Sequence, residues 1–77
     1  MIDVIVPKTG METEPVEVLE ILVSVGDLVD EGQPLMEVEG PKITFEIAAE
    51  CAGTVAEILV AVGDERDPGS VIARLSV

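Results

Sequence analysis

Short stretches of this chain alternate between apolar and polar residues, with the two-residue period of a β-strand. Met36 and Val38 are expected to point inward, and Glu37 and Glu39 outward. The apolar residues are mostly Val and Ile, and Gly or Pro interrupts them every dozen residues or so, which favours strands over helices. The predicted strands cover residues 2–6, 16–24, 28–30, 34–39, 43–48, 54–61, 65–67 and 71–76.

One segment of the chain occurs twice. Glu20–Asp27 (EILVSVGD) recurs as Glu57–Asp64 (EILVAVGD), with seven of the eight positions identical at an offset of 37 residues. Since this offset is about half of the 77-residue chain, the sequence is a tandem duplication and predicts two similar halves related by a quasi-twofold axis. Alternation also places three apolar residues of each copy on one face of its strand. They are Ile21, Val23 and Val25 in the first copy, and Ile58, Val60 and Val62 in the second.

Eight short strands in two halves predict an all-β fold, a flattened eight-stranded barrel or sandwich of two small antiparallel sheets. The length corresponds to one domain, residues 1–77, whose thin core has no room for an interior substrate cavity. An enzyme active site is therefore not expected, and no residue is assigned as catalytic or metal-binding. The junction between the copies, residues 39–43, should lie at one end of the molecule and both termini at the other.

The charged residues narrow the choice of function. There are 16 Asp and Glu residues against 4 Lys and Arg, which gives a net charge of −12. Nucleic acid and anionic membrane surfaces are not expected as partners, because both need clustered basic residues. The chain has no His and one Cys, which excludes a His-based triad and an internal disulfide. The N-terminus lacks the basic start of a signal peptide, so a cytoplasmic location is expected.

Only two side chains carry an amine, Lys8 and Lys42. Gly40-Pro41-Lys42-Ile43 predicts a β-turn in which Pro41 sets φ and Lys42 projects into solvent near the tip. Wet and acidic surroundings do not suit a general-base or Schiff-base lysine, but an exposed amine suits acylation by another enzyme. A solvated charge without further role is the alternative for Lys42, and Lys8 is expected to stay unmodified.

The chain resembles the biotinyl/lipoyl carrier domain family over essentially its whole length. Val6–Met11 is similar to the P-x-x-G-M opening of such domains, Leu22–Asp27 to their LVxxGD hairpin and Glu31–Glu39 to their xGxxLxxVE run. Lys42 follows Gly26 by 16 residues, which is the usual interval in the family. The resemblance implies a barrel-sandwich hybrid of two four-stranded antiparallel sheets, with Lys42 as the covalent attachment site of a prosthetic group. The turn that presents this lysine consists of Glu39, Gly40, Pro41 and Ile43.

Within this family the chain looks most like the lipoyl domain of 2-oxo acid dehydrogenase complex acyltransferases. The segment 43–46 (ITFE) is similar to the lipoyl run [AV]-T-x-E, although Pro41 replaces the Asp that usually precedes the lipoyl lysine. Neither Met of the biotinyl A-M-K-M pattern is present. The implied function is a non-catalytic carrier, with lipoate on Lys42 as a swinging arm for acyl transfer in a 2-oxo acid or acetoin dehydrogenase-type complex. A biotinyl carrier domain of a carboxylase or decarboxylase, and an unmodified lipoyl-like interaction module, stay open as alternatives.

The resemblance also implies a set of partners. A lipoate ligase or lipoyl transferase would load Lys42, and the arm would then serve a thiamine-diphosphate decarboxylase, an acyltransferase and a flavin dehydrogenase. The isolated domain is expected to be monomeric. The strongly acidic charge suits docking against basic rims of these partners, and solubility alone explains it as well.

Overall fold

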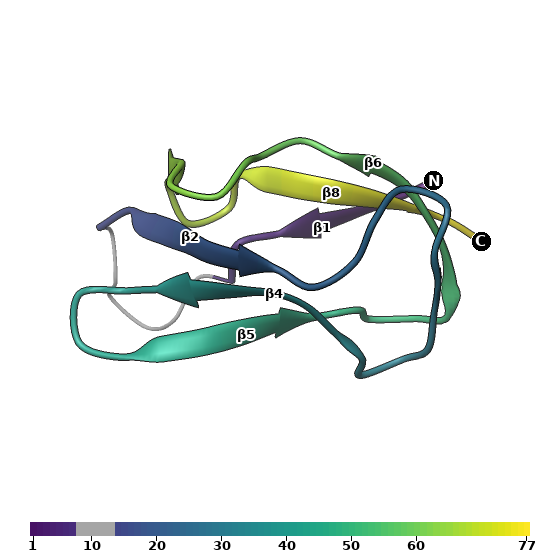
Figure 1. Ribbon diagram of the computed structural model, residues 1–77, viewed down its shortest axis with the longest axis horizontal. Helices are drawn as coiled ribbons and strands as arrows, with labels where there is room; N and C mark the ends of the chain where they lie inside the picture. Colours follow the sequence, from purple (N-terminus) through teal and green to yellow (C-terminus); the bar gives the residue numbers. More distant parts are fainter. Residues whose placement is uncertain (8–13) are drawn as a thin grey trace.

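The computed structural model describes residues 1–7 and 14–77, and every regular element in them is a β-strand. No helix in these ranges is long and apolar enough to cross a membrane. Figure 1 shows the strands along the longest axis of the molecule. They are β1 (Ile2–Ile5), β2 (Val16–Ile21), β3 (Leu28–Val29), β4 (Pro34–Glu39), β5 (Thr44–Ala48), β6 (Gly53–Ile58), β7 (Glu65–Arg66) and β8 (Val71–Ser76).

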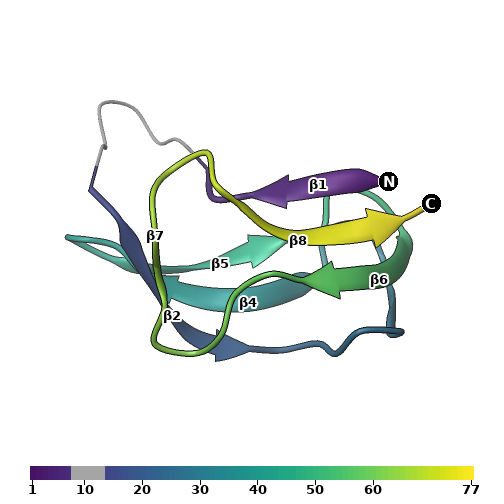
Figure 2. The same cartoon turned by 90° about the horizontal axis from the view of Figure 1, so that it is seen from above.

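The strands form two four-stranded sheets, with the orders β1-β8-β6-β3 and β5-β4-β2-β7. All the pairings are antiparallel, and the two sheets lie face to face as layers (Figure 2). The fold class predicted from the sequence is thus confirmed as two four-stranded antiparallel sheets. Among the described residues the strand pairings do not close the two sheets into a barrel, so the sandwich is the better description.

The two copies found in the sequence form equivalent strands in the structure. Strands β2, β3 and β4 occupy the same positions in their sheet order as β6, β7 and β8, which lie 37 residues later. The Gly26 N–H donates to the Val55 carbonyl at 2.8 Å, and the Gly63 N–H donates to the Val18 carbonyl at the same distance. Each turn therefore bonds to a strand of the other half, so that the halves interleave and stabilise one another.

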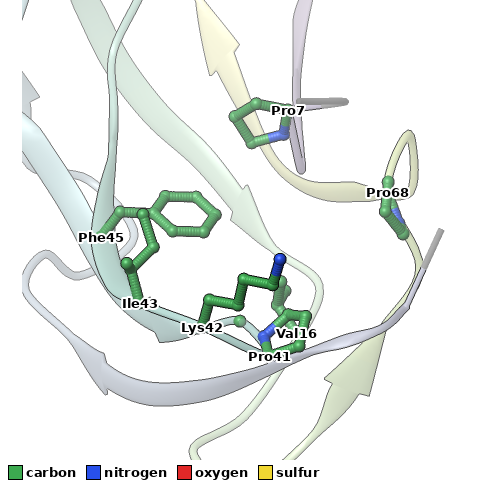
Figure 3. Close-up of a pocket in the computed structure, with 8 residues that line it drawn as sticks. Pro7, Val16, Pro41, Lys42, Ile43, Phe45 and Pro68 are labelled. Atoms are coloured by element: carbon green, nitrogen blue, oxygen red, sulfur yellow. The ribbon is translucent and has the colours of Figure 1, made fainter. Parts of the chain in front are cut away.

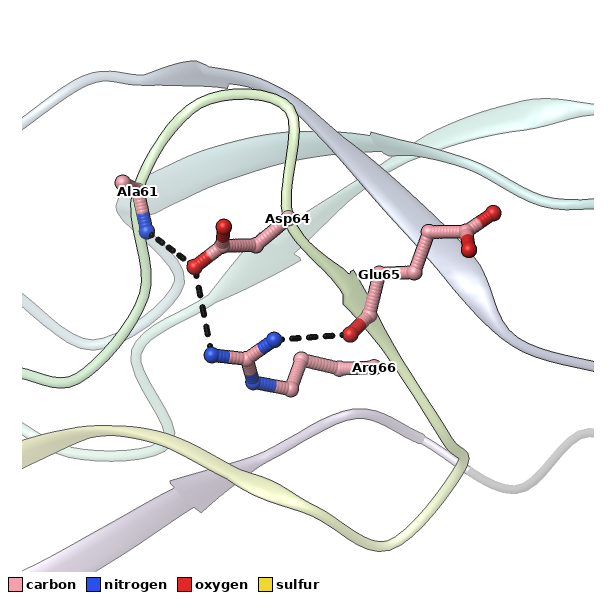
Figure 4. A network of polar contacts seen from close by, with 4 residues as sticks. All are labelled: Ala61, Asp64, Glu65 and Arg66. Carbon is pink, nitrogen blue, oxygen red and sulfur yellow. Dashed lines mark hydrogen bonds and ion pairs between the residues drawn. The ribbon is translucent and has the colours of Figure 1, made fainter.

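The Asp side chain of each repeated Gly-Asp turn caps a backbone N–H between the strand and the turn. The Asp27 carboxylate accepts a hydrogen bond from the Ser24 N–H at 2.9 Å, and the Asp64 carboxylate accepts one from the Ala61 N–H at 2.9 Å. Asp64 is braced further, because Arg66 donates to its carboxylate at 3.1 Å and to the Glu65 carbonyl at 2.7 Å (Figure 4). Such local bonds to Asp satisfy backbone groups that a continuing strand would pair.

Two strands end earlier than the sequence predicted. The strands expected over 16–24 and 54–61 end at Ile21 and Ile58, and the last apolar residue of each repeat leaves the shared face. Val25 is 61% exposed and Val62 is 64% exposed. The physical reason is that alternation applies only to extended backbone, and both strands end before these valines, which are the first residues of the turns. The other six strands agree with the prediction within one residue at each end.

The core lies between the two sheets and is built mainly of Val, with Leu, Ile, Met and Ala. Met36 and Val38 are fully buried, which confirms that they point inward. Cys51 is half-buried and packs against this core as a small apolar side chain. The buried residues are Val4, Val6, Val16, Val18, Val29, Leu35, Met36, Val38, Ile47, Ala49, Val55, Val60, Ile72, Ala73 and Leu75.

The outer faces of the two sheets differ in charge. In one sheet, Arg74 of β8 donates to Asp3 of β1 at 3.1 Å and to Glu57 of β6 at 3.3 Å. The hydrogen bond to Asp3 and the one to Glu57 raise the pKa of the Arg74 guanidinium. The position of β4 that is equivalent to Arg74 in the other sheet is Glu37, and its cross-strand neighbours are Glu20 and Glu46. The sheet that contains β4 and β5 thus has a row of carboxylates where its counterpart has an ion-paired arginine.

Candidate functional site

The connection between β4 and β5 lies at one end of the molecule, and both termini lie at the other (Figure 1). This arrangement confirms the position predicted for the junction between the two copies. Strands β4 and β5 pair up to the register of Glu39 with Thr44, so that only residues 40–43 extend beyond the sheet. The junction is therefore a tight hairpin at the pole of the sandwich.

Local chemistry closes this hairpin. The Gly40 N–H donates to the Ile43 carbonyl at 2.8 Å. A Cβ atom on residue 40 would lie 3.4 Å from the same carbonyl oxygen and 3.7 Å from the Phe45 ring, which is ordinary van der Waals contact. Pro41 has a fixed φ and no N–H to satisfy at the tip. The backbone on the N-terminal side of Lys42 is thus restricted to few orientations.

Lys42 is presented to solvent, as the sequence predicted. Pro41, Lys42, Ile43 and Glu39 are exposed, and Gly40 is half-buried. The Lys42 amine has no hydrogen bond or ion pair with any residue in the described ranges. Lys8, the other lysine of the chain, lies outside the described residues, as does Met11 of the segment that is similar to the P-x-x-G-M motif. An amine in this position is free to react with the active site of another protein.

The two sides of the hairpin differ in polarity. One side borders an apolar cavity of about 290 Å³, in which Lys42 is the single charged residue among the described residues of the lining (Figure 3). The other side borders an open hollow of about 340 Å³, and the ionisable groups that residues 1–7 and 14–77 contribute to its lining are all carboxylates. The apolar cavity is lined by Pro7, Val16, Gly40, Pro41, Lys42, Ile43, Phe45 and Pro68, and the acidic hollow by Glu14, Pro15, Glu17, Glu39, Gly40, Pro41 and Glu65.

The sequence predicted the hairpin residues of this site but not the walls of the apolar cavity. Pro7 follows β1, Pro68 lies between β7 and β8, and Val16 begins β2. The two sheets bring these residues together with Phe45 of β5, which is about 40 residues from Pro7 in the chain. No spacing rule in the sequence links these lining residues. The single Phe of the chain, which lies two residues after the exposed Ile43, was nevertheless a usable signal of apolar surface beside the hairpin.

Comparison with known proteins agrees with this geometry. The family model described as "Biotin-requiring enzyme", which covers biotin- and lipoyl-bearing domains, matches residues 2–75. The chain is 44% identical over all 77 of its residues to the dihydrolipoyllysine-residue acetyltransferase component of the pyruvate dehydrogenase complex of Haemophilus influenzae, and covers 13% of that protein. It is 47% identical over 55 residues, 71% of its length, to 42% of the biotin carboxyl carrier protein of Streptococcus mutans.

A solved structure shares the whole fold. The lipoyl domain of the 2-oxoglutarate dehydrogenase complex from Azotobacter vinelandii superposes with a TM-score of 0.80, at 25% identity over 100% of this chain and 98% of that one. The chain spans about a sixth or less of the acetyltransferases that it matches, so the likeness concerns their carrier segment. Fold, exposed lysine hairpin and family model agree, and the chain belongs to the biotinyl/lipoyl carrier domain family.

Proposed function

We propose that Lys42 carries lipoate and that the domain serves as the lipoyl carrier of an acyltransferase component in a 2-oxo acid dehydrogenase-type complex. The observation that carries this proposal is the exposed Lys42 at the tip of a stiff hairpin, where its amine has no partner among the described residues. All 77 residues of the chain align with part of an acetyltransferase. The Lys42 amine would be joined through an amide bond to the carboxyl carbon of lipoate. Such domains are carriers and not catalysts, so the reactions belong to the partners.

The residues of the chain fit this group and set how it is presented. When bound, lipoate supplies a dithiolane that is reduced as it takes up an acyl group and is later reoxidised. The fixed φ of Pro41 and the hydrogen bond from the Gly40 N–H to the Ile43 carbonyl restrict the backbone before Lys42, so that the amine leaves the molecule at this end of the sandwich. The tether raises the effective concentration of the group at each partner, which is the physical benefit of a covalent carrier.

The proposal also includes the partners of the domain, its oligomeric state and its location in the cell. A lipoate ligase or transferase would load Lys42, and a thiamine-diphosphate decarboxylase, an acyltransferase and a flavin dehydrogenase would use the loaded arm. The acetyltransferase relatives support the last three as the kind of assembly in which the domain works. We place the isolated domain as a monomer in the cytoplasm. Basic surfaces on the partners would suit the carboxylates beside the hairpin.

Biotin is the second candidate, and the match to the Streptococcus mutans biotin carboxyl carrier protein favours keeping it. The residues around Lys42 favour lipoate, because Thr44 and Glu46 follow the lipoyl pattern and no Met flanks the lysine. An amide to biotin would use the same amine and the same hairpin. Which group is attached would depend on which ligase recognises residues 39–43.

Intact mass tests the proposal. The domain is co-expressed with a lipoate ligase and lipoate, or with a biotin ligase and biotin, as wild type and as Lys42→Arg and Lys8→Arg. Arginine keeps the charge but cannot form the amide, so we expect one lipoyl increment in the wild type and in Lys8→Arg, and none in Lys42→Arg. A biotin increment instead would establish the second candidate, and no increment with either excess ligase would contradict both.

A further inference from the structure

The apolar cavity beside Lys42 has no role in presenting an amine to solvent. Its walls come from both sheets, with Pro7 and Pro68 facing Phe45 and Ile43 across the opening. In Figure 3 the Lys42 nitrogen points into the space that these residues surround. A wholly exposed arm would need no such cavity at its root.

The lining suits an aliphatic ligand. Three of the five prolines of the chain line it, and a proline contributes no backbone N–H that would need a polar partner. Ile43 is 66% exposed and Phe45 is half-buried, so apolar surface remains uncovered in the domain as it stands. The hydrophobic effect favours any apolar group that covers such surface.

The group attached at Lys42 is the one ligand that is always within reach. A lysine ammonium resists burial against apolar walls, but an amide nitrogen carries no charge and costs much less to desolvate. We infer that this cavity is a resting site for the aliphatic part of the lipoyl arm, which folds back between the hairpin and the Pro7–Pro68 wall when no partner engages it. This inference rests on the proposed function, and it adds a docked state to the free, swinging one.

The composition of the chain supplies an unambiguous probe. Phe45 is the single aromatic residue, so all aromatic ring protons in a nuclear magnetic resonance spectrum of the domain belong to one wall of the cavity. The experiment compares the domain before and after enzymatic lipoylation, with loading verified by intact mass. We expect the Phe45 ring resonances to shift on loading and to show nuclear Overhauser contacts with the arm methylene protons.

Two proline variants give a matched comparison. Pro7→Asp places a carboxylate on the cavity wall, whereas Pro15→Asp makes the same exchange at another exposed proline, which lines the acidic hollow instead. We expect the contacts between the arm and Phe45 to be lost in loaded Pro7→Asp and kept in loaded Pro15→Asp. We also expect a water-soluble phosphine to reduce the dithiolane faster in Pro7→Asp than in Pro15→Asp.

The outcomes separate the two proposals. A loaded wild type without ring shifts or contacts to the arm would overturn the resting site and leave the carrier function intact. Equal loss of contacts in both proline variants would also overturn it, because the effect would then be one of charge alone. A chain that takes up no lipoate would overturn the carrier function and the resting site together.

Discussion

The carboxylate row on the lysine-bearing sheet predicts that one charge reversal stabilises the domain. Glu37 has Glu20 and Glu46 as its cross-strand neighbours, whereas the equivalent Arg74 lies between two carboxylates and binds both. Glu37→Arg would give β4 the arrangement that β8 already has. The backbone geometry for such a triplet exists in the same molecule, so the substitution asks for no new fold.

The magnitude follows from the two pairings. Each like-charge pair across neighbouring strands is replaced by an opposite-charge pair, and such pairs contribute about 0.2–1 kcal/mol each. Because surface pairs usually fall in the lower part of this range, we expect a gain of about 1 kcal/mol in the free energy of unfolding. In a domain of this size about 1 kcal/mol raises Tm by roughly 4–8 °C.

Thermal unfolding followed by circular dichroism measures this gain, at low salt and in 1 M NaCl. The control is Glu31→Arg, which changes the net charge by the same amount at an exposed turn position outside the paired strands. At low salt Glu37→Arg should exceed Glu31→Arg, and salt should remove most of the difference, since it screens surface charges. A Glu37→Arg protein no more stable than Glu31→Arg would refute the reasoning, as would a gain that persists in 1 M NaCl.

Four further substitutions test the start of β6, the Gly-Asp turns and the hairpin. Gly53→Ala should lower the free energy of unfolding by about 1–3 kcal/mol in a urea titration, because the added Cβ would lie 2.7 Å from the Ser76 carbonyl oxygen; an unchanged midpoint would contradict this. Asp27→Ala should cost about 1 kcal/mol in the same titration, by the loss of its hydrogen bond to the Ser24 N–H. Asp64→Ala should cost slightly more than Asp27→Ala, since its half-exposed ion pair adds only a few tenths of a kcal/mol, and the reverse order would count against the role given to that pair. Pro41→Asp should speed lipoylation if the missing Asp weakens recognition by the ligase, and a time course by intact mass that matches the wild type would show that the proline turn already presents Lys42 correctly.

The sequence was sufficient for those features that depend on neighbours in the chain. Alternation located all eight strands. The repeat, together with Pro41, placed Lys42 at the exposed tip of a turn at one end of the molecule. Alternation overextended β2 and β6, because the apolar pattern continues past the strand ends at Ile21 and Ile58 up to Val25 and Val62, which belong to the turns. Turn bonds and apolar periodicity compete at those positions, and only the former decide where a strand ends.

The features that the sequence could not supply arise from packing between distant segments. The apolar cavity requires Pro7 and Pro68 to meet Phe45 across two sheets, which no local pattern encodes. The contrast between Arg74 and Glu37 likewise becomes visible only when the strand register shows which carboxylates face each of them. The count of charged residues shows the excess of Asp and Glu, but not how these residues are divided between the outer faces of the two sheets.

The hairpin joins the two copies of this duplicated chain. Its backbone bonds to itself through Gly40 and Ile43, while the interleaved turns and the core are held by other residues. Changes in residues 40–43 can therefore alter what the domain carries without weakening what holds it together. Stability and cargo are encoded in separate parts of the sequence, which explains how one scaffold can be adapted to biotin in some proteins and to lipoate in others.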